Sequence, residues 1–75
     1  MPKLPTNISG ETVVKVLKKL GYEVDHQTGS HMILRQNKEP FRRLTVPKHK
    51  ELATGTLRAI IREAGLTREE FMRLI

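Results

Sequence analysis

The alternation of apolar and polar residues divides the chain into segments with helical and extended periods. Between Val13 and Leu20, apolar residues recur at helical spacing, with lysines mostly on the other side. Ser9 is the expected start of this helix, and Gly21 lies where a left-handed residue commonly closes a helix. Residues 1–8 show neither period and are predicted to form a lead-in arm.

Three segments after this helix alternate with a period of two, which is typical of half-buried β-strands. The first segment places Tyr22, Val24 and His26 on one face. Turn residues separate the segments, and Pro47 ends the last one because proline cannot donate a ladder hydrogen bond. Strands joined by short turns pair antiparallel most simply, so we expect a three-stranded meander. The predicted strands cover residues 22–27, 31–35 and 41–46.

The second and third strands carry their apolar residues on a shared face. Met32 and Leu34 in one strand match Leu44 and Val46 in the other. This face is expected to pack against helices, as in an antiparallel sheet with one solvated side. The opposite face, which carries His31, is therefore left toward solvent and is available for function.

Two further helices are predicted in the C-terminal third. An i, i+3, i+4, i+7 apolar stripe runs from Leu57 to Ala64, with Thr54 as the expected N-cap and Gly65 as the end. The segment Thr67–Glu70 has the pattern of a capping box and begins a last short helix. The order is α-β-β-β-α with a short C-terminal helix, which predicts an α+β fold in a single domain, 1–75.

The composition makes this small domain strongly basic. Fourteen Lys and Arg residues against eight Asp and Glu residues give a net charge of +6 and a pI of about 10.2. Such a chain favours a nucleic acid or an acidic protein as its partner. With one Tyr, two Phe and no Trp, the sequence largely lacks the aromatic platforms on which single-stranded bases stack. Any nucleic acid is therefore expected to be held by its backbone.

The sequence argues against a secreted or membrane protein. It has no cysteine, which excludes a disulfide or thiolate metal site, and its longest uninterrupted apolar run is Ala59–Ile61. We expect a cytoplasmic protein without a membrane partner. His26 and His49 lack the i, i+4 spacing of a helical metal site, so no metal or other cofactor is expected.

Basic residues cluster in the two later strands and the link that follows them. They are typical of phosphate contacts, although charge on a strand edge also prevents aggregation, and each single residue fits both interpretations. As a group on a basic chain, they favour nucleic acid. They are Arg35, Lys38, Arg42, Arg43, Lys48 and Lys50.

The segment Gly29-Ser30-His31 is a candidate for chemistry. Glycine allows a close backbone approach, serine supplies a hydroxyl, and histidine is the usual base for deprotonating a ribose 2′-hydroxyl. The alternative is an ordinary half-exposed strand histidine after a turn. Similarly, Thr54-Gly55-Thr56 could hold a phosphate at a helix N-terminus, although N-capping alone explains the threonines.

The C-terminal helices also allow a DNA-binding interpretation. Two short helices joined at Gly65 have the layout of a helix-turn-helix, with Arg68 and Arg73 on the second helix. The acids Glu69 and Glu70 at the start of that helix would repel phosphates where base contacts normally begin. A DNA-binding regulator is therefore a second hypothesis.

Several short motifs, taken in order, resemble the HicA toxin family. The resemblance covers nearly everything from Ser9 to Ile75, and Met32 stands where family members often have an aromatic or polar residue after the histidine. By alternation Met32 points into the core, where it should not affect the chemistry. The matching stretches are Leu20-Gly21-Tyr22, Gly29-Ser30-His31, Leu44-Thr45-Val46-Pro47 with His49, Gly55–Ile61, Ala64-Gly65-Leu66 and Glu70-Phe71.

This resemblance implies a fold like that of double-stranded-RNA-binding domains and a metal-independent endoribonuclease that cleaves mRNA with His31 as the catalytic residue. It also implies a HicB-like antitoxin that covers His31. Arg35 or Arg43 could stabilise the phosphate and His49 could have an accessory role. A non-catalytic double-stranded-RNA-binding module remains the alternative. The residues expected to contact RNA are Gly29, Ser30, Arg35, Arg42, Arg43, Lys48 and His49.

Overall fold

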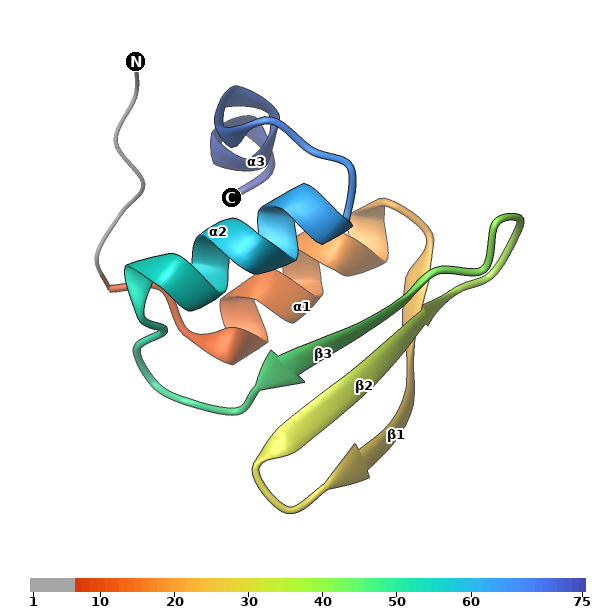
Figure 1. The fold of residues 1–75 in the computed structure, drawn as a ribbon, viewed down its shortest axis with the longest axis horizontal. Helices are drawn as coiled ribbons and strands as arrows, with labels where there is room; N and C mark the ends of the chain where they lie inside the picture. Colours follow the sequence, from red (N-terminus) through yellow and green to blue (C-terminus); the bar gives the residue numbers. More distant parts are fainter. Residues whose placement is uncertain (1–6) are drawn as a thin grey trace.

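A three-stranded antiparallel sheet and three helices form the structure, a computed structural model that describes residues 7–75 (Figure 1). The order α-β-β-β-α-α is that of the predicted α+β fold and is consistent with a double-stranded-RNA-binding-domain-like arrangement. None of the helices in this part of the chain is long and apolar enough to cross a membrane. The elements are α1 (Gly10–Lys19), β1 (Tyr22–Thr28), β2 (His31–Gln36), β3 (Arg43–Pro47), α2 (Thr54–Glu63) and α3 (Arg68–Leu74).

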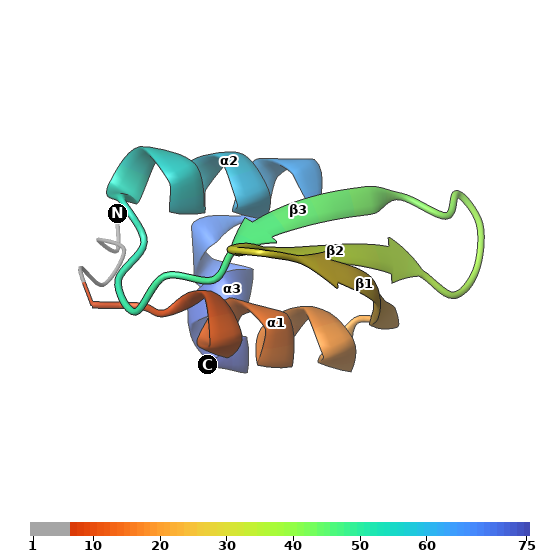
Figure 2. The same ribbon diagram turned by 90° about the horizontal axis from the view of Figure 1, so that it is seen from below.

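Helix α1 lies against one face of the sheet (Figure 2). Its N-cap is Ser9, as predicted, whose side chain accepts a hydrogen bond from the Thr12 amide at 3.1 Å. Gly21 follows the helix with a φ of +90°, a conformation that glycine adopts without steric cost. Ile8 is buried in the core beside this helix, so the predicted arm is packed at its end, whereas residues 1–6 lie outside the described part.

The second and third strands confirm the predicted faces. Met32 pairs with Val46, and Leu34 pairs with Leu44, and all four side chains are buried. His31, opposite Pro47, is exposed on the other face of the sheet. Because both strands keep a strict alternation, the side of the sheet away from α1 carries mainly polar and charged residues, together with the half-buried Ile33.

The first strand departs from the prediction because it contains a β-bulge. The register shifts between Val24, opposite Leu34, and His26, opposite Ile33. His26 is therefore on the outward face, and the prediction that it shares a face with Tyr22 and Val24 is wrong. One extra residue, Asp25, inverts the alternation after it.

Several predicted boundaries also differ from the structure, since all three strands end one residue later than predicted, at Thr28, Gln36 and Pro47. Strand β3 starts at Arg43 rather than at Phe41, which is half exposed and has a φ of 56°. The N-cap of α2 is Ala53, without a side-chain cap, because Thr54 is already the first helical residue. The prediction of Thr54 as N-cap is therefore wrong by one position.

Helices α2 and α3 complete the core. Leu57, Ile60 and Ile61 are buried on α2, which lies along β3 (Figure 1). The predicted capping box of α3 is present, since the Thr67 side chain accepts from the Glu70 amide and the Glu70 carboxylate accepts from the Thr67 amide. Helix α3 packs on α1 and buries Phe71 in the core.

Candidate functional site

An open groove, which we call the histidine groove, lies between the outward face of the sheet and one side of α2. The sheet contributes side chains of β2 and β3, and α2 contributes its first turn and one flank. Residues distant in sequence are brought together because α2 lies along β3. The groove is lined by His31, Arg43, Thr45, Pro47, Gly55, Thr56, Ala59, Ile60 and Glu63.

His31 is the first residue of β2, directly after the turn that contains Gly29 and Ser30. Gly29 has a φ of +45°, and the Ser30 hydroxyl lies 3.4 Å from His31 Nδ1, at the long end of the hydrogen-bond range. Within residues 7–75, His31 Nε2 has no hydrogen-bond partner. The imidazole is therefore held on one nitrogen and open to a ligand on the other.

The link after β3 fixes this turn through the backbone. The Lys48 amide donates to the Ser30 carbonyl at 2.6 Å, which places Lys48 beside the turn. The His49 carbonyl accepts from the Gly10 amide at 2.9 Å. His49 is exposed but does not line the histidine groove. The structure thus brings Lys48 close to His31 through the chain and leaves the His49 side chain outside the groove.

Two arginines face outward on neighbouring strands. Arg43 lines the groove together with His31, and Arg35 lies directly opposite Arg43 in the β2–β3 pairing. Like charges opposite one another destabilise a sheet. Neither guanidinium has a carboxylate partner in the described part of the chain, where the one ion pair joins His26 and Asp25. On its other side Arg35 lies opposite Glu23 in the β1–β2 pairing, so a carboxylate borders this pair of cations.

Arg42 has a different environment from its two neighbours. Its Nη1 donates to the Glu63 carbonyl at 3.4 Å, near the C-terminus of α2. It also lies near Tyr22, whose pKa is raised by burial and lowered to a smaller extent by the Arg42 charge. Arg42 therefore connects the sheet to α2 and does not line the histidine groove.

Two polar groove residues were not singled out from the sequence, whereas Thr56 was named only within the Thr54-Gly55-Thr56 candidate. Thr45 could have been found, because it alternates onto the same face as Arg43. Glu63 could not, because its position depends on how α2 packs beside the sheet. Glu63 brings a carboxylate into the groove, and the first turn of α2 brings backbone amides without a side-chain cap.

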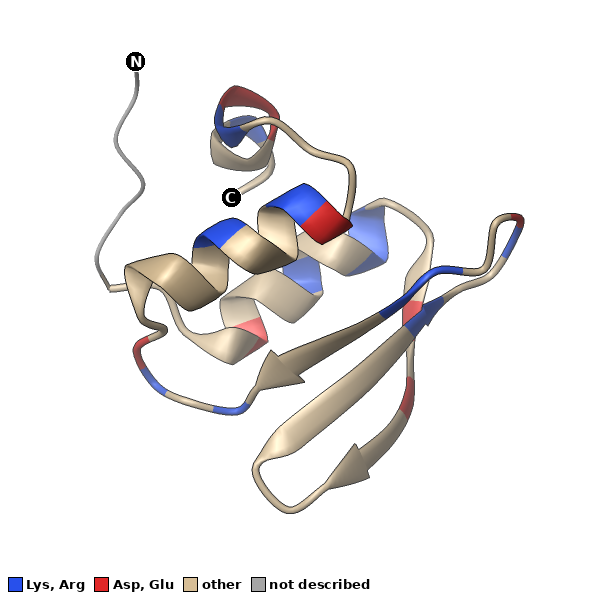
Figure 3. Ribbon diagram, in the orientation of Figure 1, with Lys and Arg blue, Asp and Glu red and all other residues tan. Residues whose placement is uncertain are grey.

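The charge distribution and the donor set define what the groove can bind. Lys and Arg residues lie on all three helices as well as on β2, β3 and the link after β3, whereas β1 carries only acids among its charged residues (Figure 3). Among residues 7–75, no group of three or more His, Asp or Glu side chains could hold a metal ion. The histidine groove therefore combines one imidazole, one guanidinium and one carboxylate, which is a set suited to proton transfer beside a bound phosphate.

The sequence is matched over residues 10–66, more than half of the chain, by a family model described as "HicA toxin of bacterial toxin-antitoxin". The matched range contains every residue that lines the histidine groove and ends before α3. Among curated proteins, none matches this chain.

Proposed function

The chain belongs to the HicA toxin family of bacterial toxin–antitoxin systems, and from this premise we propose that it is a metal-independent endoribonuclease that cleaves mRNA with His31 as the catalytic residue. The observation that carries the proposal is the presence of His31 and Arg43 in one open groove, with one imidazole nitrogen free. A general base and a phosphate-binding cation are the two groups that this reaction requires.

The reaction is transesterification within the RNA backbone. His31 Nε2 accepts the proton of a ribose 2′-hydroxyl, and the 2′-oxygen attacks the adjacent phosphorus. The new bond to the 2′-oxygen replaces the bond to the 5′-oxygen of the next nucleotide. The products are a 2′,3′-cyclic phosphate and a 5′-hydroxyl, and the 5′-oxygen takes its proton from the imidazolium or from water. No metal is needed for this chemistry.

Arg43 is the proposed stabiliser of the negative charge that develops on the phosphate oxygens. It shares the groove with His31, whereas Arg35 lies across the β2–β3 pairing from Arg43 and extends the positive surface along the RNA. Gly29, Ser30 and Lys48 border the same site and are proposed to contact the RNA. Arg42 and His49 are proposed at the margin of this surface.

Membership of a toxin–antitoxin family implies an antitoxin partner. We propose a HicB-like protein with an acidic surface that covers the histidine groove and prevents RNA from reaching His31. The same positive charge would then attract the RNA and the inhibitor. Such a pair would act in the cytoplasm, where mRNA is found.

The test compares wild type, His31→Ala and His26→Ala on a mixed single-stranded RNA in the presence of EDTA. His26 is a matched control, because it is an exposed histidine on the same face of the sheet but outside the groove. We expect His31→Ala to lose cleavage by a factor of about 10²–10⁴ and His26→Ala to keep it. Circular dichroism checks that all three proteins are folded, and mass spectrometry of the products checks for the cyclic phosphate.

Two outcomes would reject the proposal. If His31→Ala cleaves at the rate of wild type, another group is the base. If wild type and His31→Ala bind RNA equally and neither cleaves it, the chain is a non-catalytic RNA-binding module.

A further inference from the structure

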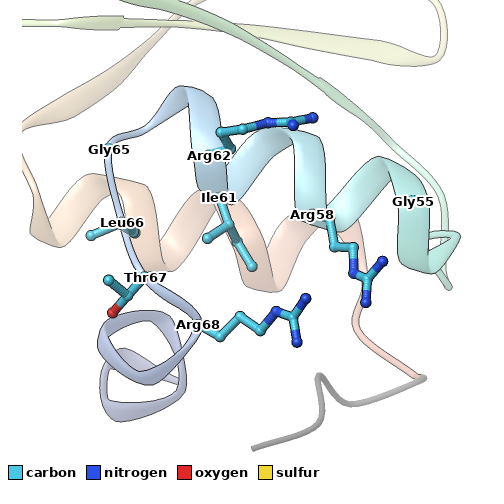
Figure 4. Close-up of a pocket in the computed structure, with 8 residues that line it drawn as sticks. All are labelled: Gly55, Arg58, Ile61, Arg62, Gly65, Leu66, Thr67 and Arg68. Carbon is cyan, nitrogen blue, oxygen red and sulfur yellow. The ribbon is translucent and has the colours of Figure 1, made fainter. Parts of the chain in front are cut away.

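A second groove, which we call the arginine groove, lies on the other side of α2, between α2 and the start of α3. Its rim carries Arg58 and Arg62, one helical turn apart on α2, and Arg68 at the first position of α3 (Figure 4). In this view Arg58 and Arg68 reach toward one another across the opening. The remaining lining residues are Gly55, Ile61, Gly65, Leu66 and Thr67.

The positive charge of this groove is not balanced by nearby carboxylates. No Asp or Glu lines it, and none of its three arginines forms an ion pair within residues 7–75. Glu70, which is close in sequence, has its carboxylate held by the Thr67 amide at 2.9 Å. Glu69 does not line the groove. Figure 4 shows the guanidinium groups of Arg58 and Arg68 turned toward the opening, whereas that of Arg62 lies on the other side of α2. Repulsion therefore acts chiefly between Arg58 and Arg68, and a bound polyanion removes it.

The floor of the arginine groove favours a phosphate backbone over a protein segment. Protein partners are usually anchored by aromatic or aliphatic side chains that fill apolar pockets. The large apolar side chains that are exposed in residues 7–75 all lie elsewhere, and Ile61 at the floor is only 4% exposed. Leu66 is half-buried there and gives the groove some apolar surface, but none of the large exposed apolar side chains of the described residues lines it, and its three arginines are of the kind that grip phosphates.

Helix α2 is the wall that the two grooves share. Its residues Ala59, Ile60 and Glu63 line the histidine groove, whereas Arg58 and Arg62 line the arginine groove. Gly55, in the first turn, lines both. The space beside Gly55 is open, because a Cβ placed there would meet no atom within 4 Å. A strand that leaves the histidine groove can thus cross α2 at Gly55 and reach the three arginines.

We propose that the arginine groove is a second phosphate-binding site, which holds the RNA strand that continues from the histidine groove across Gly55. This inference rests on the proposed function, since it takes RNA as the ligand. It also predicts how binding depends on RNA length. A long RNA occupies both grooves, whereas a short RNA occupies only the histidine groove.

The test uses proteins that carry His31→Ala, so that RNA is bound and not cut. The variant Arg58→Gln/Arg62→Gln/Arg68→Gln is compared with the control Lys15→Gln/Lys18→Gln/Arg73→Gln, which removes the same charge from residues outside both grooves. Binding of single-stranded RNAs of about 4 and about 12 nucleotides is measured by fluorescence anisotropy at several salt concentrations.

We expect the arginine variant to bind the longer RNA at least about tenfold more weakly. The slope of log K against log salt should be reduced in magnitude by about 2, since each of the three lost phosphate contacts contributes about 0.7. Its affinity for the shorter RNA should stay within about twofold of the parent protein, and the control should keep the parent salt slope. If the triple variant does not fold, Arg58→Gln/Arg62→Gln tests the same point on two exposed residues, with a slope change of about 1.4.

Three results would overturn the inference. One is an unchanged affinity of the arginine variant for the longer RNA. Another is an equal loss for both RNA lengths, which would mean a general charge effect. The third is unchanged RNA binding together with lost binding of the antitoxin, which would make the groove a protein contact. Because these assays measure binding only, a failure of wild type to cleave RNA would reject the proposed function without affecting them.

Discussion

The substitution Gly10→Ala tests how closely α1 approaches the strand that faces His31. Gly10 is buried at the first position of α1, and its amide donates to the His49 carbonyl. A Cβ at this position would overlap the carbonyl oxygen of Pro47 and lie 3.1 Å from the carbonyl carbon. Both atoms belong to the backbone of β3, so they cannot turn away as a side chain could. Either α1 or β3 must move.

The expected cost follows from two opposing terms. Overpacking a well-packed site costs about 1–3 kcal/mol, and the rigid neighbour places Gly10→Ala near the upper end. The higher helix propensity of alanine offsets this cost by at most about 1 kcal/mol. The net loss is about 2 kcal/mol, out of a total of about 4–11 kcal/mol for a chain of this length. Since 1 kcal/mol corresponds to about 4–8 °C here, we expect Tm to fall by about 8–16 °C.

Thermal unfolding followed by circular dichroism measures this change, and Gly55→Ala is the matched control. Gly55 lies in the first turn of α2, where an added Cβ meets no atom within 4 Å. The free energy of unfolding of this control should rise by about 0.4–1 kcal/mol, and its Tm should rise as well, because alanine reduces the entropy of the unfolded chain. The reasoning fails if Gly10→Ala is as stable as wild type, or if both substitutions change Tm in the same direction.

Two further predictions concern Tyr22 and the α3 cap. Burial raises the Tyr22 pKa above its usual value of 10.0, so the folded state holds the phenol proton more tightly than the unfolded state. The contribution of Tyr22 to stability is therefore fully present below pH 10 and is lost as the pH rises through the folded pKa. Tyr22 is the single tyrosine and there is no tryptophan, so ultraviolet absorbance should report ionisation of this phenol with a midpoint above 10. The variant Tyr22→Phe removes a buried hydroxyl that has no hydrogen-bond partner. It should therefore remove this pH dependence without loss of stability at neutral pH. Thr67→Ala breaks the capping box and should cost about 0.5–2 kcal/mol in urea unfolding, and an unchanged midpoint would mean that the cap does not hold α3.

Much of the fold could be predicted because the periodic segments are bounded by residues with strong local preferences. Ser9, Gly21 and Thr67 mark helix ends through their own hydrogen bonds or backbone angles, and the structure confirms all three. The bulge in β1 could not be predicted, because Asp25 carries no local preference that distinguishes an inserted residue from a regular one. The start of α2 at Thr54 was missed because Ala53 has no capping side chain.

The candidate site could likewise be predicted only in part from the sequence. Alternation along β2 and β3 was enough to place His31, Arg35 and Arg43 on one solvent-facing side. The groove itself depends on where α2 packs, and this is a tertiary contact that no local pattern encodes. For that reason Glu63 was found only in the structure, and so was the arrangement of Arg58 on the far side of the same helix.

The bulge in β1 also bears on how copies of this chain behave when they are crowded together. An uninterrupted edge strand offers a row of free backbone groups through which identical molecules can polymerise. Here the register break beside Asp25 interrupts that row, and the exposed acids Glu23 and Asp25 flank Val24. At the opposite edge, α2 lies along β3. The sheet therefore keeps its outward face open without offering a flat border on which a fibre could grow.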